Sequence, residues 1–483
     1  MKSLQVLRSM QPAVAILERS TRPWPTLSLM ILTDFVTLGG AVSLSVWGRL
    51  WMGGSLKPEF YGRLWPILLV FLFIYALQGL YPGVGISPVD ELRSITVSTS
   101  LIYFFLGAVI FLFREGKLYS RGAFVAAWIL SIVFVLLGRV IIRTIFAHRS
   151  WWGFPAIVLG AGKTGEMVVR TLQRNPRLGL KPVVILDDDP QKQGRLGGIP
   201  VLGELSLAPS LARQLNISYA IVAMPGVPPD RLLPLIEQYG QTFPHLLIIP
   251  DLFGFSSLWV EAKDLMGVLG LEIRQQLLLP GPRLTKFILE ITIASLLSVL
   301  LLPLIAFLGL LIQLDSPGSI FYGHKRLGRG AKPFTAWKFR TMVGNADEVL
   351  QSYLAQHPEA LTLWKETRKL KDDPRITRMG KFLRRTSLDE LPQLWNVLRR
   401  EMSLVGPRPI VEEEVNHYAE KFRLYTRVLP GITGLWQVSG RSNTTYEERV
   451  NLDAYYVRNW SVWLDLYILC KTLWVVLCGE GAY

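Results

Sequence analysis

Cysteine and histidine are scarce in this 483-residue chain, which holds two cysteines and five histidines. Both cysteines, Cys470 and Cys478, lie in one apolar stretch near the C-terminus, without a cysteine or histidine partner at metal-site spacing. This scarcity argues against a disulfide framework and against a zinc site. Charge is also sparse, at 18% of residues, whereas 50% of the residues are hydrophobic. A soluble globular protein of this size rarely has that balance, so we expect segments that lie within a lipid bilayer.

Acidic residues are the rarer charged class, with 37 against 52 basic residues and a formal net charge of +15. Such an excess is compatible with nucleic acid, anionic lipid or anionic substrates. Because the chain is so apolar, we favour basic loops at a membrane together with phosphorylated substrates, and no nucleic acid. A classical signal peptide is also missing, since Arg8, Glu18 and Arg19 interrupt the chain before its first long apolar run. The first membrane helix is therefore expected to act as the insertion signal.

Four apolar stretches fill the first third of the chain, and each approaches or exceeds the roughly 20 residues that span a hydrocarbon core. Tryptophan and tyrosine lie near the ends of these stretches, which are 27–51, 64–81, 92–113 and 123–146. We predict a four-helix transmembrane domain over 1–150. Basic residues before the first stretch and after the fourth favour a cytoplasmic location for both ends, although Lys57 and Arg114 in the opposite loops argue against it.

After the fourth stretch the pattern changes to short apolar strands, glycine turns and helices. One strand leads into Gly160, Gly162 and Gly165, which have Gly-x-Gly-x-x-Gly spacing, and Asp187 opens an acidic cluster farther on. This is the dinucleotide fingerprint, in which a helix N-terminus holds a pyrophosphate. We predict a Rossmann-like α/β domain over 151–283. Two interpretations stay open, because the glycines could equally serve only the tight turn and close helix packing.

A fifth apolar run, 284–314, is long enough to cross the bilayer but contains Pro303 near its middle. Proline removes one helical hydrogen bond and clashes with the preceding turn, so we expect a kink. A sharp kink would let the helix enter the bilayer and return to the same face, whereas a full crossing would place the last third of the chain outside. Hydropathy does not separate the two, and the choice depends on the chemistry of the segment that follows, because a full crossing would place that segment away from the cytoplasm.

Beyond this run the chain becomes basic and dense in motifs. They are Gly323-His-Lys-Arg-Leu-Gly328, Lys338-Phe-Arg-Thr-Met342, Asp372-Asp-Pro-Arg-Ile-Thr377, Arg384-Arg-Thr-Ser-Leu-Asp-Glu-Leu-Pro-Gln393 and Ser403-Leu-Val-Gly-Pro-Arg-Pro409. Together they resemble the bacterial sugar transferases, also called polyprenyl-phosphate hexose-1-phosphate transferases or monotopic phosphoglycosyl transferases. With the four apolar stretches and the α/β domain in front, the whole chain resembles the large undecaprenyl-phosphate galactose phosphotransferase type.

The resemblance implies a membrane protein of the α plus α/β class. A four-helix transmembrane bundle and a Rossmann-like domain would precede a mainly α catalytic domain over 284–483, with a re-entrant membrane helix and interfacial amphipathic helices. The last helical stretch, 460–478, is apolar but includes Asp465 and Lys471. Those charges favour an amphipathic helix in the membrane interface over a further span.

Asp389 and Glu390 lie within the longest motif. By local rules alone, Ser387-x-x-Glu390 forms a capping box and Pro392 begins a helix, so the pair would cap a helix N-terminus that attracts phosphate. The resemblance implies instead that Asp389 is the nucleophile and Glu390 its helper. Asp389 would attack the phosphate attached to the sugar and expel UMP, and the polyprenyl phosphate would then attack the aspartyl phosphosugar. The resemblance also implies Mg²⁺, with Asp389 as its protein ligand.

Several basic residues are candidates for binding the substrate phosphates. Arg408 lies between Pro407 and Pro409, so its guanidinium is either a pre-organised phosphate clamp or part of a stiff surface turn. The resemblance implies phosphate contacts for Lys338 and Arg384. Further candidates, each of which could instead be a lipid-facing or solvated base, are Arg340, Arg385 and Arg441.

The resemblance also implies the partners and the location. The donor would be a UDP-sugar, the acceptor polyprenyl (undecaprenyl) phosphate, and the site the cytoplasmic face of the bacterial inner membrane. Galactose is the leading sugar, while glucose and an N-acetylated sugar stay open, and a homodimer is compatible with this type. The reaction would be the first membrane step of exopolysaccharide, capsule or O-antigen synthesis.

Two other functions are compatible with parts of the sequence. A membrane-anchored, NAD(P)-dependent nucleotide-sugar dehydratase would need a Tyr-x-x-x-Lys pair, and Tyr467 and Lys471 have that spacing. They lie in the apolar C-terminal stretch, however, and no second glycine-rich loop precedes them. A non-catalytic scaffold for polysaccharide assembly would not require the combination of Asp389-Glu390, Lys338 and Arg408.

Overall fold

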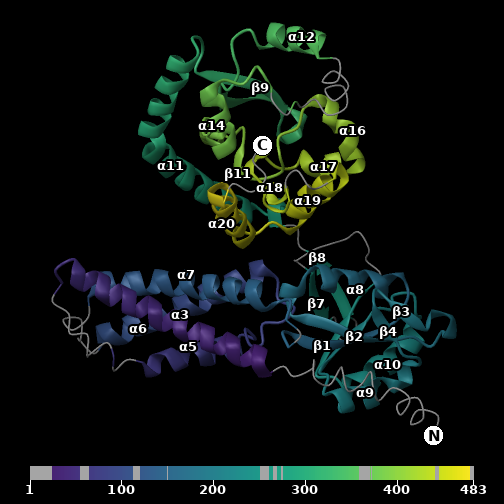
Figure 1. Ribbon diagram of the computed structural model, residues 1–483. Coiled ribbons are helices and arrows are strands. Elements are labelled where there is room, and N and C mark those ends of the chain that lie inside the picture. The colour runs from purple at the N-terminus through teal and green to yellow at the C-terminus, as the bar shows by residue number, and fades with distance from the viewer. Residues whose placement is uncertain are drawn as a thin grey trace. The chain divides into compact units, whose positions relative to one another are not determined.

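The structure is a computed structural model that describes residues 24–54, 62, 65–112, 120–149, 151–250, 260–264, 269–273, 276–357, 370, 373–440 and 445–478. The chain forms two compact units, Met1–Phe253 and Gly254–Tyr483. The first unit contains the N-terminal membrane helices and the α/β domain, and the second contains the motif-rich C-terminal part (Figure 1).

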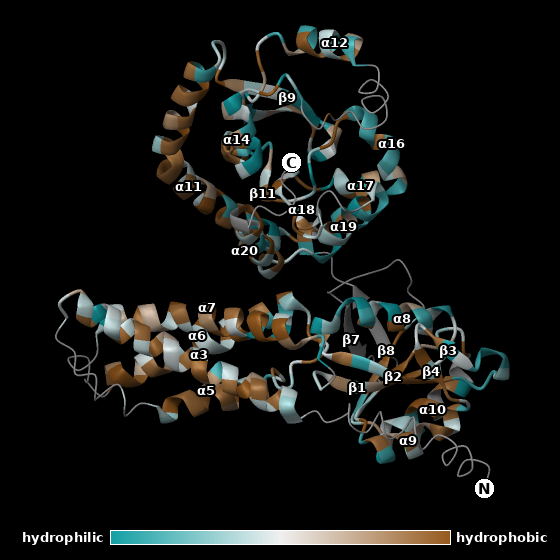
Figure 2. Cartoon of the chain, viewed as in Figure 1, coloured by the Kyte–Doolittle hydropathy of each residue, from teal (hydrophilic) through white to brown (hydrophobic). Residues whose placement is uncertain are grey.

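The first unit begins with a bundle of apolar helices, coloured as hydrophobic along most of their length in Figure 2. Its helices are α3 (Trp24–Trp51), α5 (Pro66–Leu77), α6 (Pro88–Leu112) and α7 (Arg121–Phe146). Among the described residues, α3, α6, α7 and α11 of the second unit are long and apolar enough to cross a membrane. Helix α5 has 12 residues, or about 18 Å, which is less than the roughly 30 Å hydrocarbon core. The predicted second span is therefore shorter than expected, because the chain turns at Gly79, where φ is +69°.

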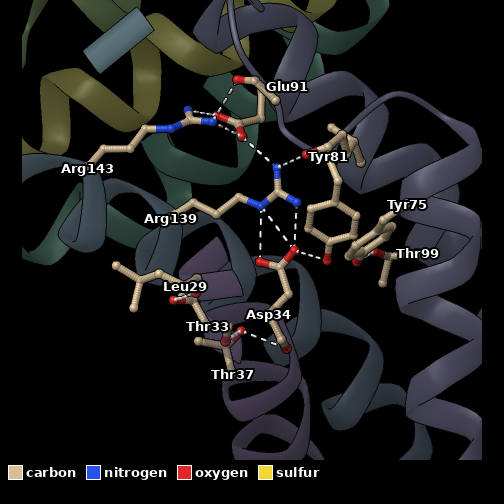
Figure 3. Close-up of polar contacts among 12 residues, drawn as sticks. Leu29, Thr33, Asp34, Thr37, Tyr75, Tyr81, Glu91, Thr99, Arg139 and Arg143 are labelled. Atoms are coloured by element: carbon tan, nitrogen blue, oxygen red, sulfur yellow. Dashed lines mark hydrogen bonds and ion pairs between the residues drawn. The ribbon is translucent and has the colours of Figure 1, made fainter. Parts of the chain in front are cut away.

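A cluster of charged side chains lies inside this bundle (Figure 3). Arg139 of α7 is 1% exposed and donates to Asp34 of α3 at 2.6 Å and to Glu91 of α6 at 2.8 Å. Arg143 contacts the second oxygen of Glu91 at 2.5 Å, and the Tyr81 hydroxyl donates to Asp34. Two cations therefore balance two carboxylates in a place where an isolated charge would be costly. The cluster joins three helices at the end of the bundle that leads into the α/β domain.

The α/β domain is built on a six-stranded sheet with the order β3-β4-β2-β1-β5-β6. Its strands are β1 (Phe154–Leu159), β2 (Leu180–Leu186), β3 (Gly194–Leu196), β4 (Ile199–Val201), β5 (Tyr219–Val222) and β6 (His245–Ile248), and its helices are α8 (Lys163–Arg174), α9 (Ala208–Leu215) and α10 (Pro229–Gly240). The strands pair in parallel except β3 with β4. Separate hydrophobic cores, around Val169 and around Leu211, contain alternate residues of β1. The predicted α/β sheet is thus confirmed.

The second unit begins with a hairpin and the long helix α11 (Pro280–Asp315), which continues through Pro303 as one helix. The remaining strands are β7 (Val260–Asp264), β8 (Leu269–Ile273), β9 (Phe321–Leu327), β10 (Pro333–Phe339), β11 (Ser403–Val405) and β12 (Gly431–Thr433). The helices are α12 (Ala346–Gln356), α14 (Arg378–Thr386), α15 (Gln393–Leu398), α16 (Val415–Tyr418), α17 (Phe422–Tyr425), α18 (Leu435–Val438), α19 (Tyr446–Asn459) and α20 (Val462–Cys478). Strands β9 and β10 pair antiparallel, and β11 pairs in parallel with β12.

Helix α11 is attached to the rest of this unit through both of its halves. Near its start, Lys286 lies 2.7 Å from Asp465 of α20. Near its end, Leu308 and Ile312 pack in one core with residues of β10 and α14. Between these attachments most large side chains are exposed, including Val299 at 75%, and Figure 2 shows the hydrophobic character of the helix. Both ends of an apolar helix therefore contact the same polar domain.

Candidate active site

The candidate site is centred on Lys338, near the end of strand β10. Its ammonium nitrogen lies 2.6 Å from Oε1 of Glu390 and 3.6 Å from Oδ2 of Asp389. The next residue, Phe339, is 2% exposed and belongs to the core that also holds Leu383 of α14. Burial of that neighbour fixes the position of Lys338 beside the two carboxylates. The structure therefore brings together three of the residues that the sequence singled out.

Asn396, which the sequence analysis missed, holds β10 against helix α15. Its side chain is fully buried, its Oδ1 accepts the Trp337 N–H at 3.0 Å, and its Nδ2 donates to the Thr335 carbonyl at 2.8 Å. The amide thus satisfies the free edge of β10 as a neighbouring strand would. This lock fixes Lys338 relative to the carboxylates that precede α15. The sequence offered one sign of this role, which is a polar asparagine within the mainly apolar helical segment Gln393–Leu398.

The carboxylate pair lies in a short 3₁₀ turn, Leu388–Glu390, between α14 and α15. The predicted capping box is wrong, because Ser387 makes no side-chain cap and the Glu390 carboxylate contacts Lys338 instead. Ser387 ends α14 in the left-handed conformation, with φ of +57°. That turn directs Asp389 and Glu390, although adjacent in sequence, towards the same lysine. Helix α15 follows Pro392, as predicted.

Burial dominates the electrostatics of Asp389, whose side chain is 15% exposed. Loss of water raises the pKa of this carboxyl, and the charge of Glu390 adds to the increase, whereas Lys338 and Arg384 oppose it. A carboxylate with few surrounding waters and two nearby cations is poorly solvated but still electrostatically supported. Such an oxygen is well suited to attack an anionic phosphorus centre, because little solvent must be removed first.

Arg384 reaches the site from α14. Its Nε–H donates to Oγ1 of Thr341 at 2.9 Å, and the neighbouring Leu383 is fully buried in the core. Burial lowers the pKa of the Arg384 guanidinium, while the charge of Asp389 raises it. The side chain is therefore fixed at one nitrogen and lies within electrostatic range of the nucleophile candidate. Thr341 is a second positioning residue that the sequence did not indicate.

The weaker phosphate-binding candidates occupy different places. Arg340 donates to the carbonyls of Pro317 (2.9 Å) and Ser316, so it joins the end of β10 to the segment after α11. Arg385 is exposed on α14. Arg441 lies outside the described residues. The contacts of Arg340 are structural and do not involve the carboxylate pair.

Arg408 belongs to a second polar cluster. Its guanidinium lies 5.2 Å from the centre of the Trp436 ring, and Arg449 lies 5.1 Å from the same ring. Arg449 and Arg326 contact Glu414 at 3.3 and 3.7 Å. The cation–π contacts and the shared glutamate fix the orientation of this basic group. Arg326 and Arg449 were not predicted, because both meet Glu414 only through tertiary packing, across 88 and 35 residues of sequence.

The glycine turn of the α/β domain has the geometry of the fingerprint. Gly160 has φ of +107°, and a Cβ at Gly165 would lie 2.0 Å from the Gly160 carbonyl, whereas Gly162 has open space. Asp187 accepts the Ala161 N–H at 2.7 Å. Burial alone would raise the pKa of Asp187, but hydrogen bonds from backbone N–H groups, including that of Ala161, hold this pKa below its ordinary value. A loop N–H and the carboxylate of the fingerprint therefore satisfy each other within the protein.

Asp389 and Glu390 are the carboxylates that the candidate site offers to a metal ion. Within the described ranges, no group of three or more His, Cys, Asp or Glu side chains could hold a metal ion. Asp389 and Glu390 form a pair, and Mg²⁺ in phosphoryl transfer is commonly held by one or two carboxylates together with substrate phosphates. The donor set therefore fits a Mg²⁺ site that the substrate completes.

Comparison with known proteins adds to this geometry. Residues 282–479 match the family model described as bacterial sugar transferase, and residues 76–250 match one described as CoA-binding domain. The chain is 38% identical over 370 residues to the UDP-galactose-lipid carrier transferase of Erwinia amylovora, covering 75% of this chain and 76% of that protein. It is 34% identical over 367 residues to the undecaprenyl-phosphate galactose phosphotransferase of Salmonella typhimurium, covering 76% and 77%.

A third relative is the UDP-glucose:undecaprenyl-phosphate glucose-1-phosphate transferase of Escherichia coli, 31% identical over 374 residues, with 74% of this chain and 76% of that protein covered. Among solved structures, a UDP-D-quinovosamine 4-dehydrogenase from Vibrio fischeri matches 21% of this chain and 80% of its own, at 23% identity and a TM-score of 0.19. That score is too low to bear on the fold. The extent and identity of the sequence matches confirm the resemblance, and this chain belongs to the bacterial sugar transferase family.

Proposed function

We propose that this protein transfers a hexose 1-phosphate from a UDP-sugar to undecaprenyl phosphate and releases UMP, with Asp389 as the nucleophile. The observation that carries the proposal is the buried Asp389 carboxylate beside Lys338 at 3.6 Å and within the field of Arg384. The names of the relatives, which specify galactose or glucose and a lipid carrier or undecaprenyl phosphate, support the same reaction class.

In the first step, an Asp389 oxygen attacks the phosphorus that carries the sugar. The bond from this phosphorus to the oxygen shared with the nucleoside phosphate breaks, and UMP leaves with the electron pair. An acyl phosphate then joins Asp389 to the phosphosugar. Lys338 and Arg384 stabilise the negative charge that spreads over the phosphoryl oxygens in the transition state.

In the second step, a phosphate oxygen of the polyprenyl phosphate attacks the same phosphorus. The Asp389 carboxylate leaves, which regenerates the enzyme and gives the polyprenyl diphosphate sugar. Glu390, whose Oε1 lies 2.6 Å from the ammonium of Lys338, orients that ammonium in both steps. Arg408 is assigned to a substrate phosphate as well, since its own cluster holds it in a fixed orientation.

Mg²⁺ bound to Asp389, with Glu390 nearby, would neutralise phosphate charge during both steps. The protein residues do the remaining work: they orient the phosphates, exclude water from the carboxylate and hold the cations in place. Neither step requires a proton transfer, because carboxylate and phosphates react as anions.

The attachments of α11 support a re-entrant helix. Lys286 near its start pairs with Asp465, and Asp315 at its end accepts the Met379 N–H at 2.9 Å, both within the same domain. A straight 36-residue helix would be about 54 Å long, and a crossing would place these two attachments on opposite faces of the bilayer. We infer that both ends lie on the cytoplasmic face, where UDP-sugars are made.

The test uses membranes that contain the full chain, Mg²⁺, undecaprenyl phosphate and a panel of UDP-sugars. We expect UMP release and a lipid-linked sugar with UDP-galactose, and neither product with Asp389→Asn. Asp347→Asn, which removes an exposed carboxylate of α12, is the matched control and should keep full activity. UMP release by Asp389→Asn at the wild-type rate would refute the assignment. Activity with UDP-glucose alone would correct the sugar, and NAD(P)-dependent loss of water from the sugar nucleotide would favour a dehydratase.

A further inference from the structure

Arg449 of helix α19 is a buried guanidinium with hydrogen-bond donors that the protein does not use. Its side chain is 8% exposed, and its Nη1 donates to Oε1 of Glu414 at 3.3 Å. Nε and Nη2 are buried too, and within the described part of the chain neither has a hydrogen-bond partner. Arg139 and Arg375 each hold a carboxylate with this same pair of nitrogens. Arg449 therefore has a two-donor edge of the shape that binds a carboxylate or a phosphate, without a protein acceptor on it.

The missing acceptor is significant because the group is charged. A buried donor that loses water without gaining an acceptor destabilises the fold, and a charged donor does so most. The guanidinium lies 5.1 Å from the centre of the Trp436 ring and 4.8 Å from the centre of the Tyr446 ring. Such cation–π contacts stabilise the charge but supply no oxygen to the Nε and Nη2 edge. A ligand that brings two oxygen acceptors would satisfy this edge.

The cluster around Arg449 holds more positive than negative charge. Glu414 is the carboxylate that Arg326 and Arg449 share. Burial alone would raise the pKa of Glu414, but a backbone N–H and the neighbouring guanidinium groups, that of Arg408 included, hold this pKa below its ordinary value. Asp453 is 3% exposed, and burial raises its pKa to about 7. Three cations are therefore set against one full and one partial negative charge, and an anion would complete the balance.

Strands β9 and β10 connect this cluster to the candidate active site. Arg326 on β9 lies opposite Phe334, four residues before Lys338 on β10, in a regular antiparallel pair. Opposed residues share a face of a sheet, and so do residues four apart on one strand, so Arg326 and Lys338 lie on the same face. Their Cα atoms are about 13 Å apart along the hairpin. Arg326 also donates to the Pro409 carbonyl at 3.3 Å, which attaches the loop of Arg408 to this hairpin.

We propose that Arg449, together with Arg408, binds the nucleoside-side phosphate of the UDP-sugar, which leaves as part of UMP. The inference rests on the proposed function, in which Lys338 and Arg384 hold the sugar phosphate beside Asp389. The Nε and Nη2 edge of Arg449 donates to two oxygens of the leaving phosphate and stabilises the charge that this phosphate gains as its bond to the sugar phosphate breaks. Because the edge is covered in the structure, an aromatic ring beside it turns aside as the phosphate enters.

The test measures UMP binding to the detergent-purified full chain by isothermal titration calorimetry, with uridine as the probe that lacks a phosphate. Arg449→Lys keeps a positive charge beside Glu414 but removes the two-donor edge. This variant should fold, which thermal unfolding verifies, and should bind UMP about 10- to 100-fold more weakly than the wild type. Its affinity for uridine should not change. The matched control, Arg423→Lys, replaces an exposed guanidinium on α17 and should bind UMP as the wild type does.

The two half-reactions give a second readout, which a purely structural role would not divide. Arg449→Lys should form the hexose-phosphate adduct about 10- to 100-fold more slowly than the wild type. Discharge of that adduct by undecaprenyl phosphate should keep the wild-type rate, because UMP has already left.

Unchanged UMP affinity in Arg449→Lys, or an equal loss of uridine affinity, would overturn the assignment. Equal slowing of both half-reactions would also overturn it, and would assign Arg449 to the acceptor phosphate or to the fold. UMP binding needs no nucleophile, so Asp389→Asn should bind UMP as tightly as the wild type. A chain that binds UMP through Arg449 but transfers no sugar would refute the proposed function and leave this phosphate site standing.

Discussion

Replacement of Lys338 by methionine removes one positive charge from the candidate site while keeping a side chain of similar length. In the structure this ammonium lies 3.6 Å from Asp389 and 2.6 Å from Glu390. The Lys338→Met variant should still fold, because the lysine side chain is 30% exposed. Its first half-reaction, measured as UMP release before any acceptor is added, should be slow.

The size of the effect follows from the distance. Two unit charges 3.6 Å apart attract by about 1 kcal/mol in bulk water and about 5 kcal/mol at an effective dielectric constant of 20. The site is partly buried, so the transition state should lose about 2 to 4 kcal/mol of stabilisation, which slows UMP release by about 30- to 1,000-fold. Loss of Lys338 also removes an interaction that lowers the pKa of Asp389. The acid limb of the pH–rate profile should therefore move to higher pH.

Rapid-quench measurement of UMP release over a range of pH values tests both effects. The matched control is Lys381→Met, which removes an exposed lysine from α14, the helix that carries Arg384. That control should keep the wild-type rate and pH profile. A Lys338→Met enzyme with near wild-type UMP release and an unmoved acid limb would refute the electrostatic role assigned to this lysine.

Three further predictions concern stability. Arg139→Met leaves the buried Asp34 without its cation and should lower the free energy of unfolding by about 3 to 5 kcal/mol. In detergent this should appear as a fall in Tm on the order of 10 °C. An unchanged Tm would contradict a structural role for the cluster. Gly165→Ala should destabilise the first unit, since the added Cβ would lie 2.0 Å from a carbonyl oxygen. Gly162→Ala should not, because the space beside Gly162 is open. Equal unfolding curves for the two variants would disprove this prediction. Burial raises the pKa of Asp389, so ionisation of this carboxyl destabilises the folded state as pH rises. Asp389→Asn should therefore have a higher Tm than wild type at neutral pH, and the difference in Tm should close near pH 4. A lower Tm for Asp389→Asn at neutral pH would contradict this prediction.

The apolar runs and the motifs were sufficient to predict much of the molecule. Twenty or more apolar residues need a bilayer or a core, so α3, α6 and α7 could be located to within a few residues. The short α5 could not, because hydropathy continues past the point where Gly79 turns the chain. The Gly160 turn was predictable, since its spacing has a local mechanical reason, but the engagement of Asp187 by the Ala161 N–H was not.

The site shows the same division between local and distant causes. Ser387 and Glu390 have capping-box spacing, yet the left-handed turn at Ser387 sends the glutamate to Lys338, 52 residues away in sequence. Asn396 bonds to a strand about 60 residues earlier, and no local pattern announces such a contact. Sequence therefore indicates which side chains carry the chemistry, whereas the packing of β10 against α15 determines how they meet.

The covalent intermediate tests the central claim most directly. Full-length protein is incubated with UDP-galactose and Mg²⁺ without acceptor, quenched in acid, digested and analysed by peptide-resolved mass spectrometry. The account predicts one hexose-phosphate adduct on the peptide that contains Asp389, discharged when undecaprenyl phosphate is added before the quench. Stoichiometric UMP release without an adduct, or an adduct on another residue, would contradict it.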